Sequence, residues 1–445
     1  MINSVHSHWG ASLENYATLY SQTSDFNRSF VEDQTLFSSS ARDGIAVITQ
    51  AADEEDETEV ELLASKLALS MLRSIMILSS SRLGILYFAH PGLTHGCIKL
   101  MKTIKVDGFV TPFSYEYGYL CFNIAKMSLG VCLVEKLDSD LMEHMRANFM
   151  SKDNPSILTE YLCQLALDRM QSQSGAHLDL HSIFGWGGSS VNGGGSGLVI
   201  SKSEAFELMD IIGADRKAFM MVLSSSYTPG VSMILLLLWQ LTVQEDFSTE
   251  STFQSDILET YLDLMWRIAL SATACDWPMV ALVVSASGVH MKRLRGKTVD
   301  TEDSRTILKA YIRGIPLVDG STYRHTALKL NPNSPYFIRQ NILPGTEDLC
   351  PALVETLLDR TWEITSWEEA LEEKIDAADI IGVGLQDLCL ILDTYVKHAL
   401  PCQSSLMQTV LEILAAKDLL GLIGVGIQRL DPDRADDGLL LCEGT

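Results

Sequence analysis

The chain has 445 residues, of which 47% are hydrophobic and 20% charged, a composition typical of a globular protein rather than a disordered one. Its 33 basic and 57 acidic residues give a formal net charge of −24. This acidity disfavours a general nucleic-acid binder, which needs cations to displace counterions from phosphates, and adsorption to anionic lipid. We therefore expect neither nucleic acid nor a membrane as a partner.

Cysteine usage indicates a reducing compartment. The nine cysteines are odd in number, form no C-x-x-C pair and lie in apolar surroundings. The N-terminal residues lack the basic start and apolar core of a signal peptide. The most apolar stretch, Val231 to Val243, is shorter than the ~20 residues that cross a bilayer and predicts a buried core helix. We expect a cytoplasmic protein.

The chain begins with a leader that we expect to be weakly ordered. It ends in the acidic run DEEDETEVE, whose like charges indicate a solvated boundary. Helical periodicity follows, and proline at the first helical position predicts helix starts at Pro91, at Pro112 after Thr111, and at Pro155 after Asn154. Further helical runs are predicted near 202–224, 229–245, 253–272 and 277–289.

The predicted fold class is all-α, because no stretch alternates apolar and polar residues long enough to indicate a sheet. Helices resume near residue 350, and the spacing of Thr365 and Glu368 fits a capping box. The segments we expect are a leader (1–58), a helical region (59–174), a glycine-rich flexible connector (175–200), a helical region (201–312), an irregular proline-containing segment (313–348), a C-terminal helical region (349–430) and a tail (431–445).

One internal similarity bears on how the helices are arranged. IIGVGLQDL (380–388) and LIGVGIQRL (422–430) match at an offset of 42 residues, within the ~40 to 47 residues of armadillo and HEAT repeats. In such repeats each helical unit buries its apolar face by stacking on its neighbours. The match occurs once, so an armadillo- or HEAT-like superhelix and an irregular helical bundle both remain open.

The stretch FGWGGSSVNGGGSGLVIS (184–201) resembles a phosphate-binding loop only superficially. It lacks the lysine of a P-loop in its required place, and Ser190 stands where a dinucleotide fingerprint needs its third glycine. Ser201 and Glu204 fit a capping box that would satisfy the next helix internally. We interpret the stretch as a flexible connector and expect no cofactor.

Weak candidates for a metal site are His177, Asp179 and His181, which would share one face of an extended segment. The alternative is a polar loop whose side chains face water. No G-x-S-x-G nucleophile motif is present, so no enzyme of a familiar type is indicated.

A basic patch follows the predicted helix near 277–289 and is a candidate for nuclear import. It contains Lys292, Arg293, Arg295 and Lys297. The alternative is a solvated helix end, where cations are favoured by the helix dipole.

The aromatic residues Tyr115, Tyr119 and Phe122 recur at helical spacing and have two interpretations. Core packing with hydrogen-bonded hydroxyl groups is one, and a groove for a protein partner is the other.

Two parts of the chain resemble a multi-copy group of uncharacterised helical proteins predicted in basidiomycete fungi. The stretches are YFAHPGLTHGCIKLMKTI with PFSYEYGYLCFNIA, and SKSEAFELMDIIGADRKAFMMVLSSSYTPGVSMILLLLW, within residues 60–245. The resemblance implies a fungal cell and a variable glycine-rich insert. It transfers no catalytic or binding residue, because the group has no assigned activity.

The sequence therefore predicts an interaction or scaffold protein that binds a protein partner through grooves between helices. An enzyme of an unrecognised type and a regulatory adaptor imported into the nucleus are the alternatives.

Overall fold

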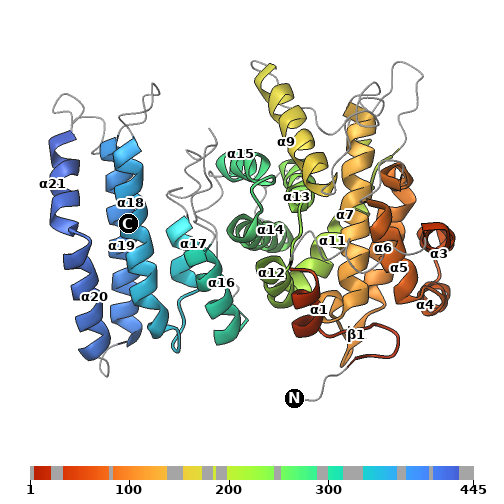
Figure 1. Ribbon diagram of the computed structural model, residues 1–445, viewed down its shortest axis with the longest axis horizontal. Coiled ribbons are helices and arrows are strands. Elements are labelled where there is room, and N and C mark those ends of the chain that lie inside the picture. The colour runs from red at the N-terminus through yellow and green to blue at the C-terminus, as the bar shows by residue number, and fades with distance from the viewer. Residues whose placement is uncertain are drawn as a thin grey trace. The chain divides into compact units, whose positions relative to one another are not determined.

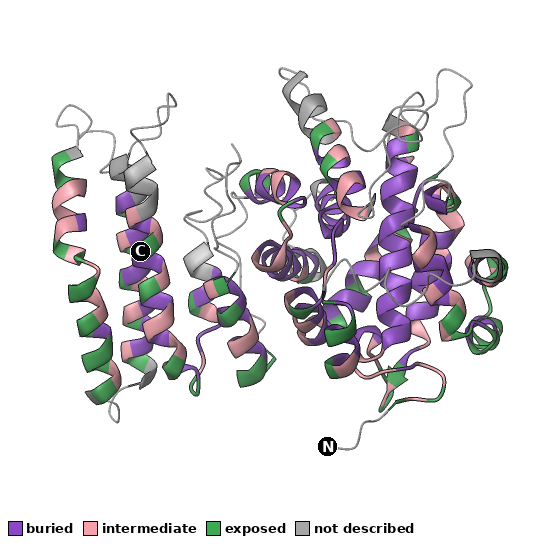
Figure 2. Cartoon of the chain, viewed as in Figure 1, coloured by how far each residue is buried: buried purple, intermediate pink, exposed green. Residues whose placement is uncertain are grey.

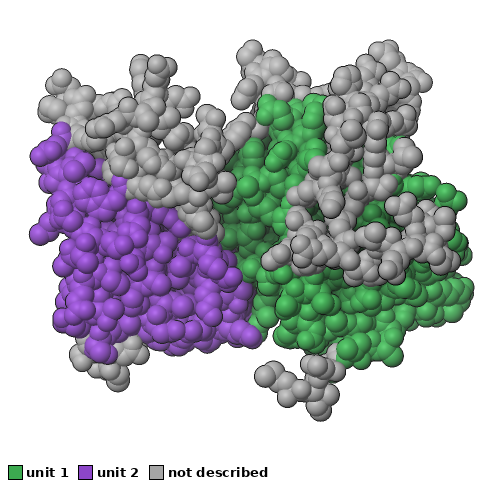
Figure 3. Space-filling model, viewed as in Figure 1, with its two compact units in different colours: residues 1–293, 320–323 green, residues 294–319, 324–445 purple. Residues whose placement is uncertain are grey.

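The computed structural model confirms the all-α prediction. It describes residues 5–21, 34–79, 84–137, 154–172, 184–186, 198–244, 252–287, 299–313, 334–367, 377–399 and 404–429. These residues form 18 α-helices and, among them, one small antiparallel hairpin (Figure 1). The chain divides into two compact units, unit 1 with residues 1–293 and 320–323, and unit 2 with residues 294–319 and 324–445 (Figure 3).

Unit 1 contains most of the helices. In chain order its elements are α1 (Leu13–Leu19), α3 (Gln34–Asp53), α4 (Glu57–Lys66), α5 (Leu69–Ser79), the 3-10 helix η1 (Gly84–Phe88), α6 (Pro91–Lys102), β1 (Lys105–Val106), β2 (Phe109–Val110), the 3-10 helix η2 (Pro112–Ser114), α7 (Glu116–Leu137), α9 (Asn154–Ser172), α11 (Lys202–Ala214), α12 (Arg216–Ser225), α13 (Val231–Gln244), α14 (Thr252–Ser271) and α15 (Trp277–Ser287).

The core of unit 1 is built around α7 and α13, which are buried on all sides because their residues are apolar on every face (Figure 2). Helices α5, α6, α9 and α13 pack around α7. By length and composition the stretch Glu116–Lys136 could cross a membrane, but its apolar 18-residue window is wholly buried inside the protein, as in a core helix. The bent pair α4 and α5 passes the same test only if it is counted as one span.

Several helix starts lie where the sequence predicts them. His90 caps α6, its Nδ1 accepting from the Gly92 N–H, and Pro91 is the first helical residue. The capping box of α11 is present, with Ser201 as the N-cap. The long helix predicted from Pro112 begins instead at Glu116, because Pro112 opens η2 and Tyr115 then has extended backbone.

The structure differs from the expected weakly ordered leader. Residues 34–53 form α3, which packs against α5 and α6 and buries Ala41, Ile48 and Ala51 completely. The approach is close, since a Cβ added at Gly96 of α6 would lie 1.9 Å from the Ile48 carbonyl oxygen. The acidic run therefore does not mark the start of the folded part.

The two ends of the glycine-rich stretch are held together rather than apart. The Val199 N–H donates to the Phe184 carbonyl (3.2 Å), and Trp186 Nε1 donates to the Ile200 carbonyl (2.6 Å). The rings of Phe184 and Trp186 also stack, with centroids 5.0 Å apart. Residues 187–197 lie outside the described part. The described residues on both sides of the stretch lie together in unit 1, so the stretch does not separate the two units.

Unit 2 is built around the packed helix pair α18 and α19. Its elements are α16 (Thr301–Arg313), α17 (Ser334–Gln340), the 3-10 helix η6 (Glu347–Leu349), α18 (Cys350–Trp367), α19 (Ala377–Ala399), α20 (Ser404–Ala416) and α21 (Leu419–Arg429). Helices α16 and α20 pack on α18, and α17 and α21 pack on α19. Helices α20 and α21 follow one another nearly end to end along one side of this pair (Figure 1).

Two local predictions in this unit have clear outcomes. Thr365 lies in the last turn of α18, so it does not cap a following helix. The matching stretches 380–388 and 422–430 fall on α19 and α21, which pack together, and a Cβ added at Gly426 would lie 2.9 Å from Ile381 Cγ2. Within the segment expected to be irregular (313–348), the structure describes residue 313 and residues 334–348, and these include the helix α17.

Candidate functional site

A cavity of about 370 Å³ opens on unit 1 beside α6. It lies among the α3–α4 connection, α6, the hairpin of β1 and β2, and α11. Its walls carry more acidic than basic groups; the lining residues are Glu54, Glu55, Glu57, Val60, Glu61, Lys99, Lys102, Thr103, Lys105, Val110 and Glu207.

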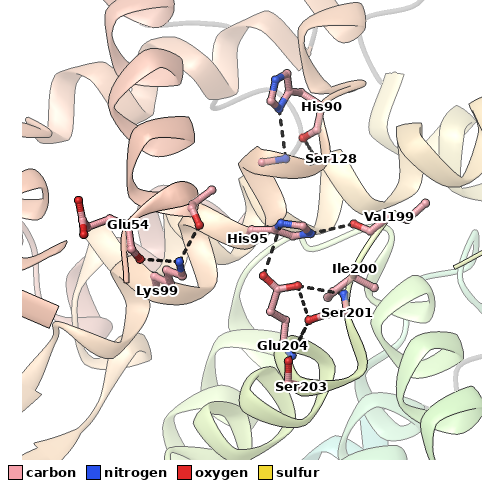
Figure 4. Close-up of polar contacts among 12 residues, drawn as sticks. Glu54, His90, His95, Lys99, Ser128, Val199, Ile200, Ser201, Ser203 and Glu204 are labelled. Carbon is pink, nitrogen blue, oxygen red and sulfur yellow. Dashed lines mark hydrogen bonds and ion pairs between the residues drawn. The ribbon is translucent and has the colours of Figure 1, made fainter. Parts of the chain in front are cut away.

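The three lysines of this cavity hold its walls together. Lys99 Nζ donates to the carbonyl oxygens of Ala52 (2.6 Å) and Glu54 (2.7 Å), which satisfies backbone at the end of α3 (Figure 4). Lys102 forms an ion pair with Glu207 of α11, and Lys105 Nζ lies 3.6 Å from a carboxylate oxygen of Glu61. These cations are engaged by the protein itself, which makes the cavity a poor site for an anionic ligand.

The hairpin that closes one side of the cavity is a feature the sequence analysis missed. Asp107 and Gly108 both have positive φ, 52° and 84°, as a two-residue turn between antiparallel strands requires. Asp-Gly is the usual sequence signal for such a turn, and it was present in KVDGFV. The strands are only two residues each, too short for an alternating pattern to reveal.

Next to the cavity, α6 and α11 are joined by a polar cluster of His95, Glu204 and Ser201 (Figure 4). His95 Nε2 lies 3.1 Å from the Val199 carbonyl oxygen, and Nδ1 lies 3.4 Å from Glu204 Oε1. Ser201 Oγ donates to Glu204 Oε2 (2.6 Å). A nucleophilic serine would have to donate to the histidine. Here both residues bind the same carboxylate, so the cluster fixes the start of α11 and activates no nucleophile.

Two buried polar groups on α7 also have structural partners. Glu116 is fully buried and accepts two bonds from Arg73, at 2.7 and 2.8 Å, and one from the Tyr20 hydroxyl at 2.5 Å. Lys126 Nζ donates to Asn123 Oδ1 at 2.8 Å, and burial lowers the pKa of its ammonium group to about 8. With only 3% of Lys126 exposed, this amine is closed to a substrate.

The outermost helix pair of unit 2 exposes apolar side chains. On α20, Met407 is 37% and Leu411 55% exposed; on α21, Leu420 is 80% and Ile427 63% exposed. On α21 the opposite face is also apolar, since Leu422 is buried. A surface helix normally has one apolar stripe, so a second one was a signal that the sequence analysis did not use.

The predicted partner groove at Tyr115, Tyr119 and Phe122 is not an open surface. Tyr119 and Phe122 have no exposed area and Tyr115 is partly buried. The Tyr119 ring stacks on those of Tyr16 and Tyr20, and Phe122 packs edge-on against Phe113 and Phe219. The groove interpretation is wrong and core packing is correct, because segments distant in the sequence cover this face of α7.

The remaining predicted sites lie outside the described residues. They are the metal candidates His177, Asp179 and His181, and the basic patch Lys292, Arg293, Arg295 and Lys297. Within the described ranges, no group of three or more histidine, cysteine or acidic side chains is placed to hold a metal ion.

Comparisons with known proteins add no relative. No protein-family model matches the chain, and neither the curated proteins nor the solved structures gave a significant match. The resemblance to helical proteins of basidiomycete fungi therefore stays a prediction.

Proposed function

We propose that the protein is a scaffold that binds protein partners and that unit 2 is a short helical-repeat stack of the armadillo or HEAT kind. The support is that α16 and α20 both contact α18, and that the two stretches related by 42 residues fall on the contacting helices α19 and α21. We further propose a cytoplasmic location, which agrees with the cysteine usage.

The observation that carries this proposal is the exposed apolar face of α20 and α21. A stack of helical repeats that ends in solvent is normally capped by a repeat with a polar outer face. Here the last pair presents Leu411, Leu420 and Ile427 instead. Exposed apolar side chains that gather on a protein surface are typical of interaction sites.

The test is a pull-down with the tagged full-length chain from cells that express it naturally. We expect the Leu411→Glu variant to lose partners that the wild type retains, because an unpaired carboxylate would be buried on binding. The matched control is Phe109→Glu, which places the same charge on a 74% exposed side chain of the hairpin in unit 1. Partners lost equally from both variants, or from neither, would contradict the proposal.

An enzyme remains the second candidate because of the charged cavity beside α6. A ligand screen by thermal shift tests it, since a compound that binds only the folded protein raises its melting temperature. The third candidate, a nuclear adaptor, is tested by imaging the Arg293→Ala, Arg295→Ala double variant, which should change its localisation if this patch directs import.

A further inference from the structure

We propose that the cavity beside α6 binds a small aliphatic diamine, whose ammonium groups meet the carboxylates of its walls and whose methylene groups lie on its valines. The cavity of about 370 Å³ combines both kinds of wall. It belongs to unit 1, so binding there does not depend on the scaffold function proposed for unit 2.

The walls of the cavity carry an unbalanced negative charge. Five glutamates and three lysines line it, which leaves a net charge of −2. Lys102 and Lys105 each already face a glutamate. The carboxylates of Glu55 and Glu57 form no ion pair or hydrogen bond with another described side chain. A ligand with two positive charges would balance these walls, whereas an anion or a neutral molecule would leave the excess in place.

Helix geometry places part of this charge beside an aliphatic surface. Glu57, Val60 and Glu61 stand at positions i, i+3 and i+4 of α4, so they share one face, and all three line the cavity. Val110 of the hairpin lines it as well. A ligand whose methylene groups lie on Val60 would therefore bring the ammonium group at its end close to the carboxylates of α4.

The spread of the carboxylates favours an elongated cation. They come from the α3–α4 connection, from α4 and from α11. Within the described ranges, no three of them are placed to hold a metal ion together. Charges separated by methylene groups fit such a wall better than one ion that needs several oxygen ligands around it. The volume lies near the lower end of the ~300–1,000 Å³ of small-molecule sites, so a short diamine fits better than a peptide.

The test is isothermal titration calorimetry of the full-length protein with 1,4-diaminobutane, for which we expect saturable binding of a single molecule per chain. Butylamine, which has the same chain and a single charge, should bind about tenfold more weakly. The uncharged 1,4-butanediol should not bind. An ionic strength of about 0.15 M limits the diffuse attraction of a chain of net charge −24 to a range of about 8 Å.

A pair of double variants assigns the binding to the cavity. Glu55→Gln with Glu57→Gln should weaken the binding of 1,4-diaminobutane about tenfold, because two ion pairs at the cavity wall are lost. The matched control is Asp53→Asn with Glu59→Gln, which removes two charges from the same stretch outside the cavity lining and should bind as the wild type does. All four side chains are exposed, so both double variants should fold, which circular dichroism checks.

Three results would overturn the inference. One is the absence of saturable binding of 1,4-diaminobutane to the wild type. Another is an equal loss of affinity in the two double variants, which would show diffuse attraction to an acidic chain. The third is Mg²⁺ that binds more tightly than the diamine and is lost with Glu55 and Glu57, which would assign the cavity to a metal ion. None of these results changes the outcome expected for the Leu411→Glu pull-down, so the scaffold proposal is tested separately.

Discussion

The carboxyl group of Asp387 provides a sharp test of the packing of unit 2. Asp387 lies on α19 and is 1% exposed, and its Oδ2 has no hydrogen-bond partner among the described residues. Burial disfavours the charged form and raises the pKa of this carboxyl from its ordinary value of 3.8 to about 8. We expect Asp387→Asn, which keeps the shape of the side chain and cannot ionise, to remove the resulting pH dependence.

The sign follows from proton binding. Between pH 3.8 and about 8 the folded state holds a proton that the unfolded state has lost, so the stability of the wild type falls as pH rises through this window. From pH 6 to pH 8 this loss is about 2 kcal/mol, or about fiftyfold in the equilibrium for opening α19. The Asn variant should show no such loss from this position.

Hydrogen exchange of α19 amides in the full-length protein measures this opening. At each pH the exchange rate of the wild type is divided by that of the variant, which removes the intrinsic effect of pH on exchange. This ratio should rise about fiftyfold from pH 6 to pH 8. Asp393→Asn is the matched control, because Asp393 lies on the same helix, is exposed and pairs with Lys397 at 2.6 Å. A ratio for Asp387→Asn that does not change with pH would refute the assignment of a neutral, buried carboxyl.

Two further predictions concern the backbone. Gly96→Ala should destabilise the protein by about 1–3 kcal/mol, because the new Cβ would lie 1.9 Å from the Ile48 carbonyl oxygen. Gly382→Ala should instead stabilise α19 by about 0.5–1 kcal/mol, because its Cβ would meet nothing within 4 Å and alanine favours a helix over glycine. Urea unfolding measures both, and a Gly96→Ala variant at least as stable as the wild type would contradict the close approach of α3 and α6. Replacing residues 187–197 by four residues should leave the helical circular dichroism unchanged and change the free energy of unfolding by less than about 1 kcal/mol. The reason is that hydrogen bonds already join the residues on either side of this stretch. A large loss of helix would show that residues 187–197 hold unit 1 together.

Local signals in the sequence predicted helix type and many helix starts. Pro91 and the Ser201–Glu204 pair act within one turn of the backbone, so their effect does not depend on what packs against them. The helical runs predicted near 229–245, 253–272 and 277–289 match α13, α14 and α15. The run near 202–224 is divided into α11 and α12 by a break at Asp215, two residues after Gly213, a signal that the predicted continuous run did not take into account.

Burial was the part that sequence alone could not supply. The face of α7 that carries Tyr119 is covered by rings of Tyr16 and Tyr20, about a hundred residues earlier in the chain. The order of α3 likewise depends on α5 and α6, which the acidic run 53–61 separates from it in sequence but not in space. Periodicity identifies the apolar face of a helix, but not which element covers it.

The helices α7 and α21 show how the same kind of residue leads to opposite conclusions. Both carry apolar residues on more than one face, which a helix in contact with water on one side does not need. Around α7 the chain itself supplies neighbours on every side, so the pattern is explained by the core. Around α21 it supplies α19 on one side, while Leu420 and Ile427 stay exposed on the other. An apolar face that the fold does not cover is typical of a surface that binds a partner.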